Sequence, residues 1–145
     1  MNNLYFPDLV KRHFEFLLAK NRFSITSETY TGFPLAEWIV NLCADELCIR
    51  VSIDKSQVFI DIGLPGKDME WLDLMYVMMY ISKDHKWKYL WPSGAINEQY
   101  YDKQLAHLSG ILKEYQEQIK RQVINIANDR DEKRRFEKFI RAHSK

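Results

Sequence analysis

The chain has 145 residues, of which 46% are hydrophobic and 14% aromatic, and 21 Lys and Arg stand against 20 Asp and Glu. This length suffices for one domain with a buried core, which excludes wholesale disorder. A net charge of +1 excludes a uniformly basic binder of nucleic acid or anionic membranes. No apolar run reaches the length of a membrane-spanning helix and the first residues lack a signal-peptide pattern, so we expect a cytoplasmic protein.

The N-terminal segment predicts one helix and then a strand. Apolar residues recur at helical spacing over residues 7–20, with a proline in the first turn and Asn21 as a stop signal. Residues 23–31 are rich in β-formers and alternate in part, which favours a strand. The Gly-Phe-Pro sequence at 32–34 ends it.

Three alternating segments follow, at residues 37–43, 47–53 and 57–62, with short polar turns between them. One register for each hairpin, which pairs Val40 with Val51 and Val51 with Ile60, places all the large apolar side chains on one face. These segments therefore predict an antiparallel meander with one buried face.

The same register also determines the other face of the meander. Asn41, Arg50 and Asp61 fall in a row across the three strands, where Arg50 can neutralise Asp61. Cys43 falls opposite Cys48 at the end of the first hairpin. In a reducing cytoplasm we expect both cysteines to be thiols.

The second half of the chain predicts mostly helix. Asp68 is a suitable N-cap for a helix that ends near Ser82. Residues 86–91 alternate basic and aromatic side chains and fit a short edge strand or a loop that covers the core. A heptad-like apolar seam then runs from Tyr101 to Ile126, with Gly110 as its internal weak point.

The C-terminal residues form a basic amphipathic segment. Residues 129–145 hold seven basic and four acidic groups, and a break at Asn128-Asp129 precedes a helix over residues 130–143. We therefore expect an α+β fold: an N-terminal helix, a three- to four-stranded antiparallel β-meander with one buried face, a further helix and a long C-terminal helical region. Residues 1–128 would form one domain and residues 129–145 a basic helical tail.

Motifs for the common enzyme classes are absent from the sequence. It contains no glycine-rich phosphate loop, no zinc-ligand spacing and no nucleophile elbow. We therefore predict no enzyme activity, no cofactor and no metal site.

Charge is unevenly distributed, with nine acidic and three basic residues between positions 28 and 73. The chain resembles small bacterial immunity proteins of polymorphic-toxin and contact-dependent growth-inhibition systems. The resemblance lies in the meander 38–42, 47–53 and 58–62, the following Trp71-Leu72, and the run 104–115.

This resemblance implies a non-enzymatic protein that binds and blocks one cognate toxin domain, which in many such systems is a nuclease. An acidic surface would suit a basic nuclease cleft. Our hypothesis for the docking surface is six carboxylates with Trp87 as an anchor: Asp45, Glu46, Asp54, Asp61, Asp68 and Asp73.

Two alternative functions stay open at this point. The basic tail can bind nucleic acid through Lys133, Arg134, Arg135, Lys138 and Arg141, helped by the Lys-Trp-Lys sequence at 86–88. The apolar seam from Tyr101 to Ile126 can instead form a homodimeric adaptor.

Overall fold

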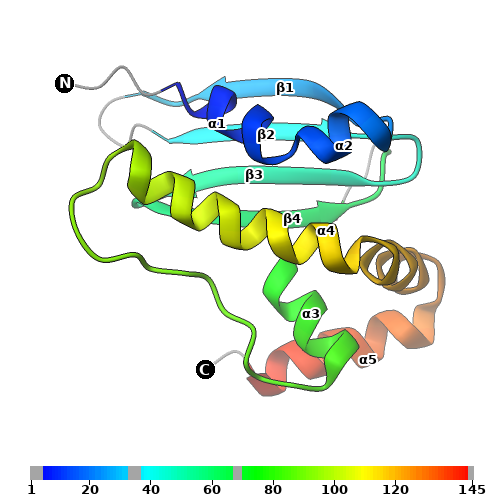
Figure 1. Cartoon of the computed structure of the whole chain (residues 1–145). Helices are drawn as coiled ribbons and strands as arrows, with labels where there is room; N and C mark the ends of the chain where they lie inside the picture. Colours follow the sequence, from blue (N-terminus) through cyan, green and yellow to red (C-terminus); the bar gives the residue numbers. More distant parts are fainter. Residues whose placement is uncertain (1–4, 33–36, 67–69, 144–145) are drawn as a thin grey trace.

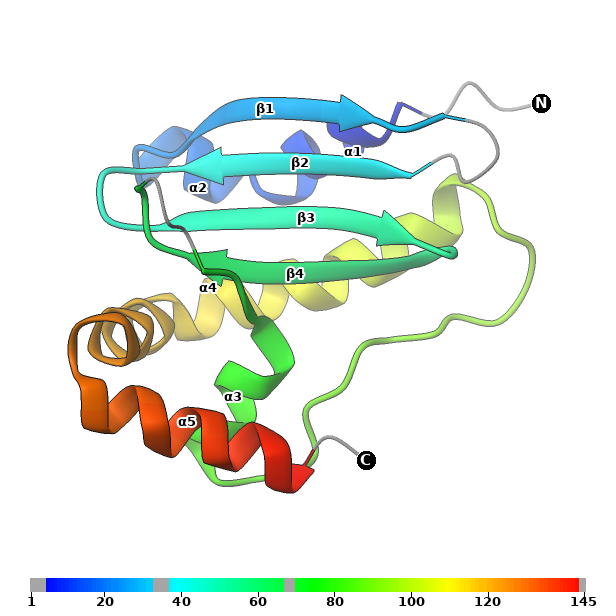
Figure 2. The ribbon, with the colours of Figure 1, turned by 180° about the vertical axis from the view of Figure 1, so that it is seen from behind.

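The computed structural model describes residues 5–32, 37–66 and 70–143, and it has the predicted α+β architecture. Helices cover one face of an antiparallel sheet with strand order β1-β2-β3-β4-β5 (Figure 1). The other face has none of the described helices over it (Figure 2). The elements are α1 (Phe6–His13), α2 (Glu15–Lys20), β1 (Ser24–Tyr30), β2 (Trp38–Cys43), β3 (Cys48–Asp54), β4 (Gln57–Gly63), β5 (Leu72–Asp73), α3 (Leu74–Ser82), α4 (Glu98–Asn128) and α5 (Arg130–His143).

The predicted register of the meander is confirmed in both hairpins. Val40 pairs with Val51 and Val51 with Ile60, and the flanking pairs follow the same alignment. The inner face is apolar and buried against the helices. β1 adds a fourth strand, as the sequence allowed, with an irregularity in its pairing between Ile25 and Ser27.

Two expectations around the sheet were wrong. The helix begins later than predicted: Leu72 and Asp73 form a short fifth strand and α3 begins at Leu74, while the predicted cap Asp68 lies outside the described residues. Cys43 and Cys48 are joined by a disulfide rather than present as thiols. The register brings their Cα atoms to 4.1 Å, which is close enough for a bridge.

The N-terminal helical segment is interrupted at Phe14, where φ is −109° and ψ is 21°. The break allows α1 and α2 each to direct apolar residues at the sheet, so that Phe6, Leu9, Phe14 and Leu17 are all buried. The sequence pattern did not show this break because the apolar spacing continues through it.

The long helix α4 bends at Tyr115, where φ is −115° and ψ is 17°, and not at Gly110. Its apolar seam lies inside this chain's own core: Leu105, Leu108, Leu112 and Ile119 are almost fully buried. These seam residues are therefore occupied by contacts within this chain. Beyond the bend, α4 continues to α5, which turns back along α3 (Figures 1 and 2).

A buried amide fastens α4 to the β3–β4 turn. Gln104 is fully buried, accepts a hydrogen bond from the Val58 backbone N–H at 2.7 Å, and donates one to the Ser56 carbonyl at 3.3 Å. Because it pairs backbone groups that the turn leaves open, it holds one end of the sheet against α4.

Candidate functional site

The uncovered face of the sheet, here called the outer face, carries a row of polar side chains across all five strands. The pairings place Ser27 beside Asn41, Asn41 beside Arg50, Arg50 beside Asp61, and Asp61 beside Asp73. The sequence predicted the three central members, and the structure extends this polar row by one residue on each side. The row lies on rigid strands, so its side chains start from fixed positions.

Hydrogen bonds order one half of the polar row. Asn41 Nδ2 donates to Ser27 Oγ at 2.9 Å, and Arg50 Nε donates to Asn41 Oδ1 at 3.2 Å. The Arg50 guanidinium carbon lies 4.2 Å from the centre of the Trp71 ring. Stacking on an indole and hydrogen bonding through Nε leave the terminal N–H groups of Arg50 able to bind an external acceptor.

Arg50 does not form the ion pair with Asp61 that the sequence led us to expect. Within the described residues, Asp61 has neither an ion pair nor a side-chain hydrogen bond. Burial, the largest cause, and the nearby Asp73 carboxylate raise the pKa of Asp61 to about 6, although Arg50 acts in the opposite direction. Asp61 is thus a half-buried carboxyl group whose charge changes near neutral pH.

Asp73 has a structural role that explains its position. Its Oδ1 accepts hydrogen bonds from the Met75 and Tyr76 backbone N–H groups and so caps α3, while its Oδ2 accepts one from the Tyr89 hydroxyl at 2.9 Å. Burial raises the pKa of Asp73, and these hydrogen bonds oppose that effect. Because both oxygens are engaged within the chain, Asp73 is poorly placed to bind a partner.

Tyr89 closes part of the exposed edge of β4. Its hydroxyl accepts a hydrogen bond from the Ile60 N–H at 3.3 Å and lies 3.1 Å from the Ile60 carbonyl. Burial and the Asp73 carboxylate raise the pKa of Tyr89 well above its usual range. The hydroxyl thus covers backbone groups that the two-residue strand β5 does not reach.

The predicted acidic docking surface is not assembled in the structure. Asp45 and Glu46 lie in the β2–β3 turn at one end of the sheet, whereas Asp54 ends β3 at the other end, about 20 Å away for a strand of this length. Glu46 is paired with Lys120 at 2.8 Å. The described carboxylates therefore do not form one patch, and Asp68 lies outside the described residues.

Trp87 is also not the exposed anchor that we expected. Its ring packs against Tyr115 with 5.5 Å between centres, and its Nε1 donates to Ser82 Oγ at 2.7 Å. The exposed tryptophan of this segment is Trp91, at 64% exposure. Residues 86–91 form a loop and not a strand, so the alternation in the sequence did not determine which aromatic ring faces solvent.

Trp71 belongs to this site, although the sequence pattern did not indicate it. The predicted helix from Asp68 included Trp71, and a helical position for Trp71 gives no reason to expect a contact with Arg50. The signal that could have placed it was Asp73, since an Asp after Leu72 is as good an N-cap as Asp68 and would have left Trp71 outside the helix.

In comparisons with known proteins, no family model, no curated protein and no solved structure matches the chain. Within the described residues, no group of three or more His, Cys, Asp or Glu is placed to hold a metal ion. No described helix is both long enough and apolar enough to cross a membrane.

Proposed function

We propose that this chain is a non-enzymatic binding protein that neutralises a cognate toxin domain by covering it, and that the outer face of the sheet is its docking surface. The observation that supports this proposal is the ordered Ser27–Asn41–Arg50–Trp71 arrangement on a face that the described helices leave open (Figure 2). The resemblance to immunity proteins supplies the class of partner.

The composition of the outer face fits a protein interface. Arg and Trp are over-represented among residues that contribute most to binding, and here Arg50 of the central strand β3 is stacked on Trp71, which precedes the edge strand β5. Their hydrogen bonds and stacking restrict side-chain motion before a partner arrives, which lowers the entropy cost of association. Ser27 and Asn41 beside them provide further polar contacts of the kind found around such centres.

The acidic turns take a different role in this proposal from the one expected at first. Asp45 and Asp54 are exposed at opposite ends of β3 and border the outer face instead of forming its centre. Charges at the border of an interface mainly change the association rate and its salt dependence. A basic toxin domain would therefore be attracted by these carboxylates and anchored at Arg50 and Trp71.

The test is binding to the toxin domain encoded by the gene immediately upstream, measured by native mass spectrometry and calorimetry. Arg50→Ala and Trp71→Ala should each weaken the complex at least about tenfold, because each removes one half of the stacked pair. Lys103→Ala is the matched control, since Lys103 is exposed on α4, on the helix-covered side of the sheet. Thermal unfolding of each variant verifies that the fold is unchanged.

Two results would overturn the proposal in different ways. If no complex forms with that toxin domain, the function is wrong. If a complex forms but keeps its affinity in both the Arg50 and Trp71 variants, the function stands and the assigned surface is wrong. Reversal of Asp45 and Asp54 to Lys should slow association with little change in the dissociation rate.

A further inference from the structure

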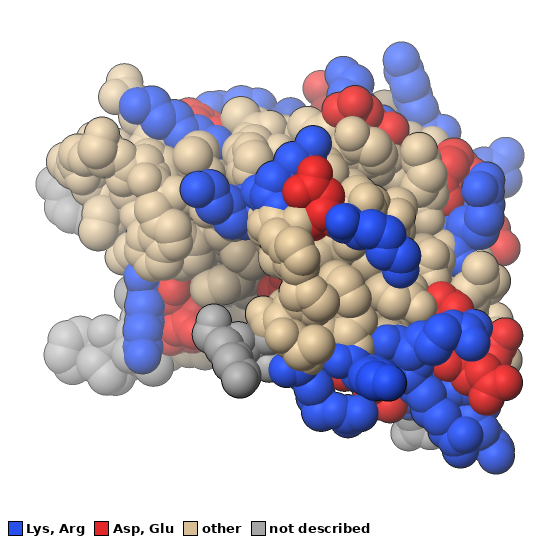
Figure 3. Space-filling model, turned by 90° about the horizontal axis from the view of Figure 1, so that it is seen from below, with Lys and Arg blue, Asp and Glu red and all other residues tan. Residues whose placement is uncertain are grey.

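The outward side of α5 carries a stripe of four cations. Arg130, Arg134, Lys138 and Arg141 recur at steps of four, four and three residues, so they lie on one side of the helix, and all four are exposed. Within the described residues none of them forms an ion pair; the pairs on α5 involve Lys133 and Arg135 instead. Figure 3 shows Lys and Arg side chains gathered at one corner of the surface seen from below, with acidic side chains among them.

The stripe is held in place by the inward side of α5. Phe136 is buried, with its ring centre 5.3 Å from that of Tyr80 on α3. The Tyr80 hydroxyl donates to Glu132 at 2.8 Å, and Gln122 of α4 donates to the same carboxylate oxygen at 3.0 Å. The cations therefore project from a helix that is fixed to two others, and not from a frayed tail.

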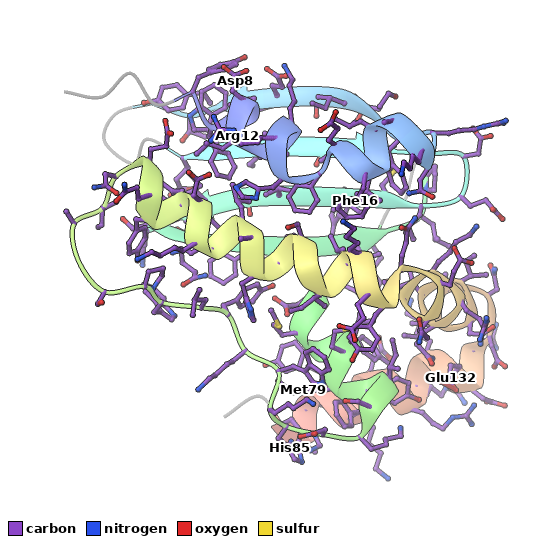
Figure 4. The ribbon with its side chains drawn as sticks, in the orientation of Figure 1. Asp8, Arg12, Phe16, Met79, His85 and Glu132 are labelled. Atoms are coloured by element: carbon purple, nitrogen blue, oxygen red, sulfur yellow. A yellow bond between two sulfur atoms is a disulfide. The ribbon has the colours of Figure 1, made fainter. Side chains whose placement is uncertain are left out.

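The C-terminal end of α5 meets the loop that follows α3. The His85 and His143 rings stack with 4.4 Å between centres, and Lys83 Nζ lies 5.9 Å from the centre of the Phe139 ring. Figure 4 shows His85 close to the end of α3 that carries Met79, whereas Glu132 lies toward the opposite end of α5. These contacts join the basic segment 83–88 to the C-terminal end of α5, while the stripe lies on the side of the helix away from Phe136.

An aromatic hollow of about 460 Å³ opens between α3, the loop that follows it and the C-terminal end of α5. Its walls include Tyr76, Met79, Trp87, Trp91 and His143, with Lys88 beside them. Trp91 is 64% exposed, so most of its large apolar ring is open to solvent. Asp73 closes the hollow on the side of the sheet, where its carboxylate is engaged by the α3 cap and Tyr89.

We propose that α5 and the loop 83–91 form a binding surface for single-stranded nucleic acid. Phosphates would lie along Arg130, Arg134, Lys138 and Arg141, and a base would stack on Trp91 at the hollow. Two features together favour this ligand over an acidic peptide. Cations repeat along one line of α5, and the hollow at the C-terminal end of that helix, reached by His143, is lined by aromatic rings on which any base can stack. The surface lies on α5 and the loop that follows α3, so it does not depend on the toxin-binding proposal.

The test uses fluorescein-labelled single-stranded RNA and DNA of twelve nucleotides, with binding followed by anisotropy between 50 and 200 mM salt. The double variant Arg134→Glu/Lys138→Glu should weaken binding at least tenfold. It should also reduce the slope of log affinity against log salt by about 1.4, since each single-strand phosphate contact contributes about 0.7. Trp91→Ala should weaken binding about tenfold with the salt slope unchanged, because stacking releases no counterions.

Two further variants sharpen the test. Glu137 lies on the same side of α5, three residues after Arg134 and four before Arg141, so Glu137→Gln should strengthen binding. Lys20→Glu/Lys103→Glu makes the same change of net charge on α2 and α4, where both residues are exposed, and should leave the affinity within twofold.

The proposal is overturned if neither oligonucleotide binds at 50 mM salt, or if the Lys20/Lys103 control weakens binding as much as the α5 variant. It is also overturned if Trp91→Ala has no effect while poly-glutamate competes as well as RNA. In that case the surface binds polyanions, including acidic proteins, by charge alone.

Discussion

The two faces of the sheet carry different chemistry on the same strands. On the inner face, Leu42, Ile49 and Ile62 lie side by side and are inaccessible to solvent. On the outer face, one residue along each strand, Asn41, Arg50 and Asp61 are half-exposed and polar. Because successive residues alternate between faces, a single register determines both sets.

The comparison shows where stability and recognition are separated in this fold. Apolar burial on the inner face stabilises the domain in proportion to the area removed from water. The outer face adds little to that buried area. Its side chains can therefore be replaced to suit a different partner with only a small loss of stability. This separation is why we assign binding to the outer face, and it can be tested by substitutions on neighbouring residues of one strand.

The largest effect is expected on the inner face. Ile49→Ala should lower the free energy of unfolding by about 2–5 kcal/mol, because it removes buried methyl and methylene groups between Leu42 and Ile62. Urea unfolding followed by circular dichroism measures the change. Ser52→Ala, on the outer face of the same strand, is the control and should change stability by less than about 0.5 kcal/mol. Equal losses in both variants would contradict the separation of the two faces.

The sheet was the part of the fold that could be predicted, because its signal is local. A one-residue slip of β3 would expose Ile49, Val51 and Ile53 together, so the apolar alternation leaves only one acceptable register. The polar row followed from that register without further information. α5 and its cap at Asp129 were also predictable, since the cap precedes a helical pattern directly.

The remaining features depend on contacts between distant segments. Asp68 and Asp73 are equally good caps by residue type, and Asp73 also accepts a hydrogen bond from the Tyr89 hydroxyl, sixteen residues later, which no local pattern reports. The bend at Tyr115 accompanies its contact with Trp87, which no helical periodicity reports. Likewise, the stack of His85 on His143 joins two basic segments that the sequence shows only as separate charge runs.

A smaller effect is expected from the disulfide at the edge of the outer face. Reduction of Cys43–Cys48 should lower the free energy of unfolding by about 2 kcal/mol, because the bridge closes a short loop in the unfolded chain. Urea unfolding with and without reductant measures this difference. The Cys43→Ala/Cys48→Ala variant should show no response to reductant. Alkylation of both cysteines in the native protein without reductant would show thiols and contradict the bridge.

The smallest effect concerns the charge of Asp61. The pH dependence of stability at this residue shows whether the outer face around it is half-buried or fully solvated. The folded-state pKa of about 6 lies above the unfolded value of 3.8, so folding takes up a proton between these values. Below about pH 4, Asp61 is protonated in the folded and the unfolded state and does not lower the stability. As the pH rises through 6, the half-buried carboxyl group becomes charged and the protein loses stability. The side chain of the Asp61→Asn variant stays neutral at every pH. The stability of this variant relative to wild type should therefore increase by about 1 kcal/mol between pH 3.5 and 7.5. The expected increase is modest because the Asp61 carboxyl group is still partly solvated. If the stability difference between Asp61→Asn and wild type stayed constant over this pH range, the outer face around Asp61 would be fully hydrated.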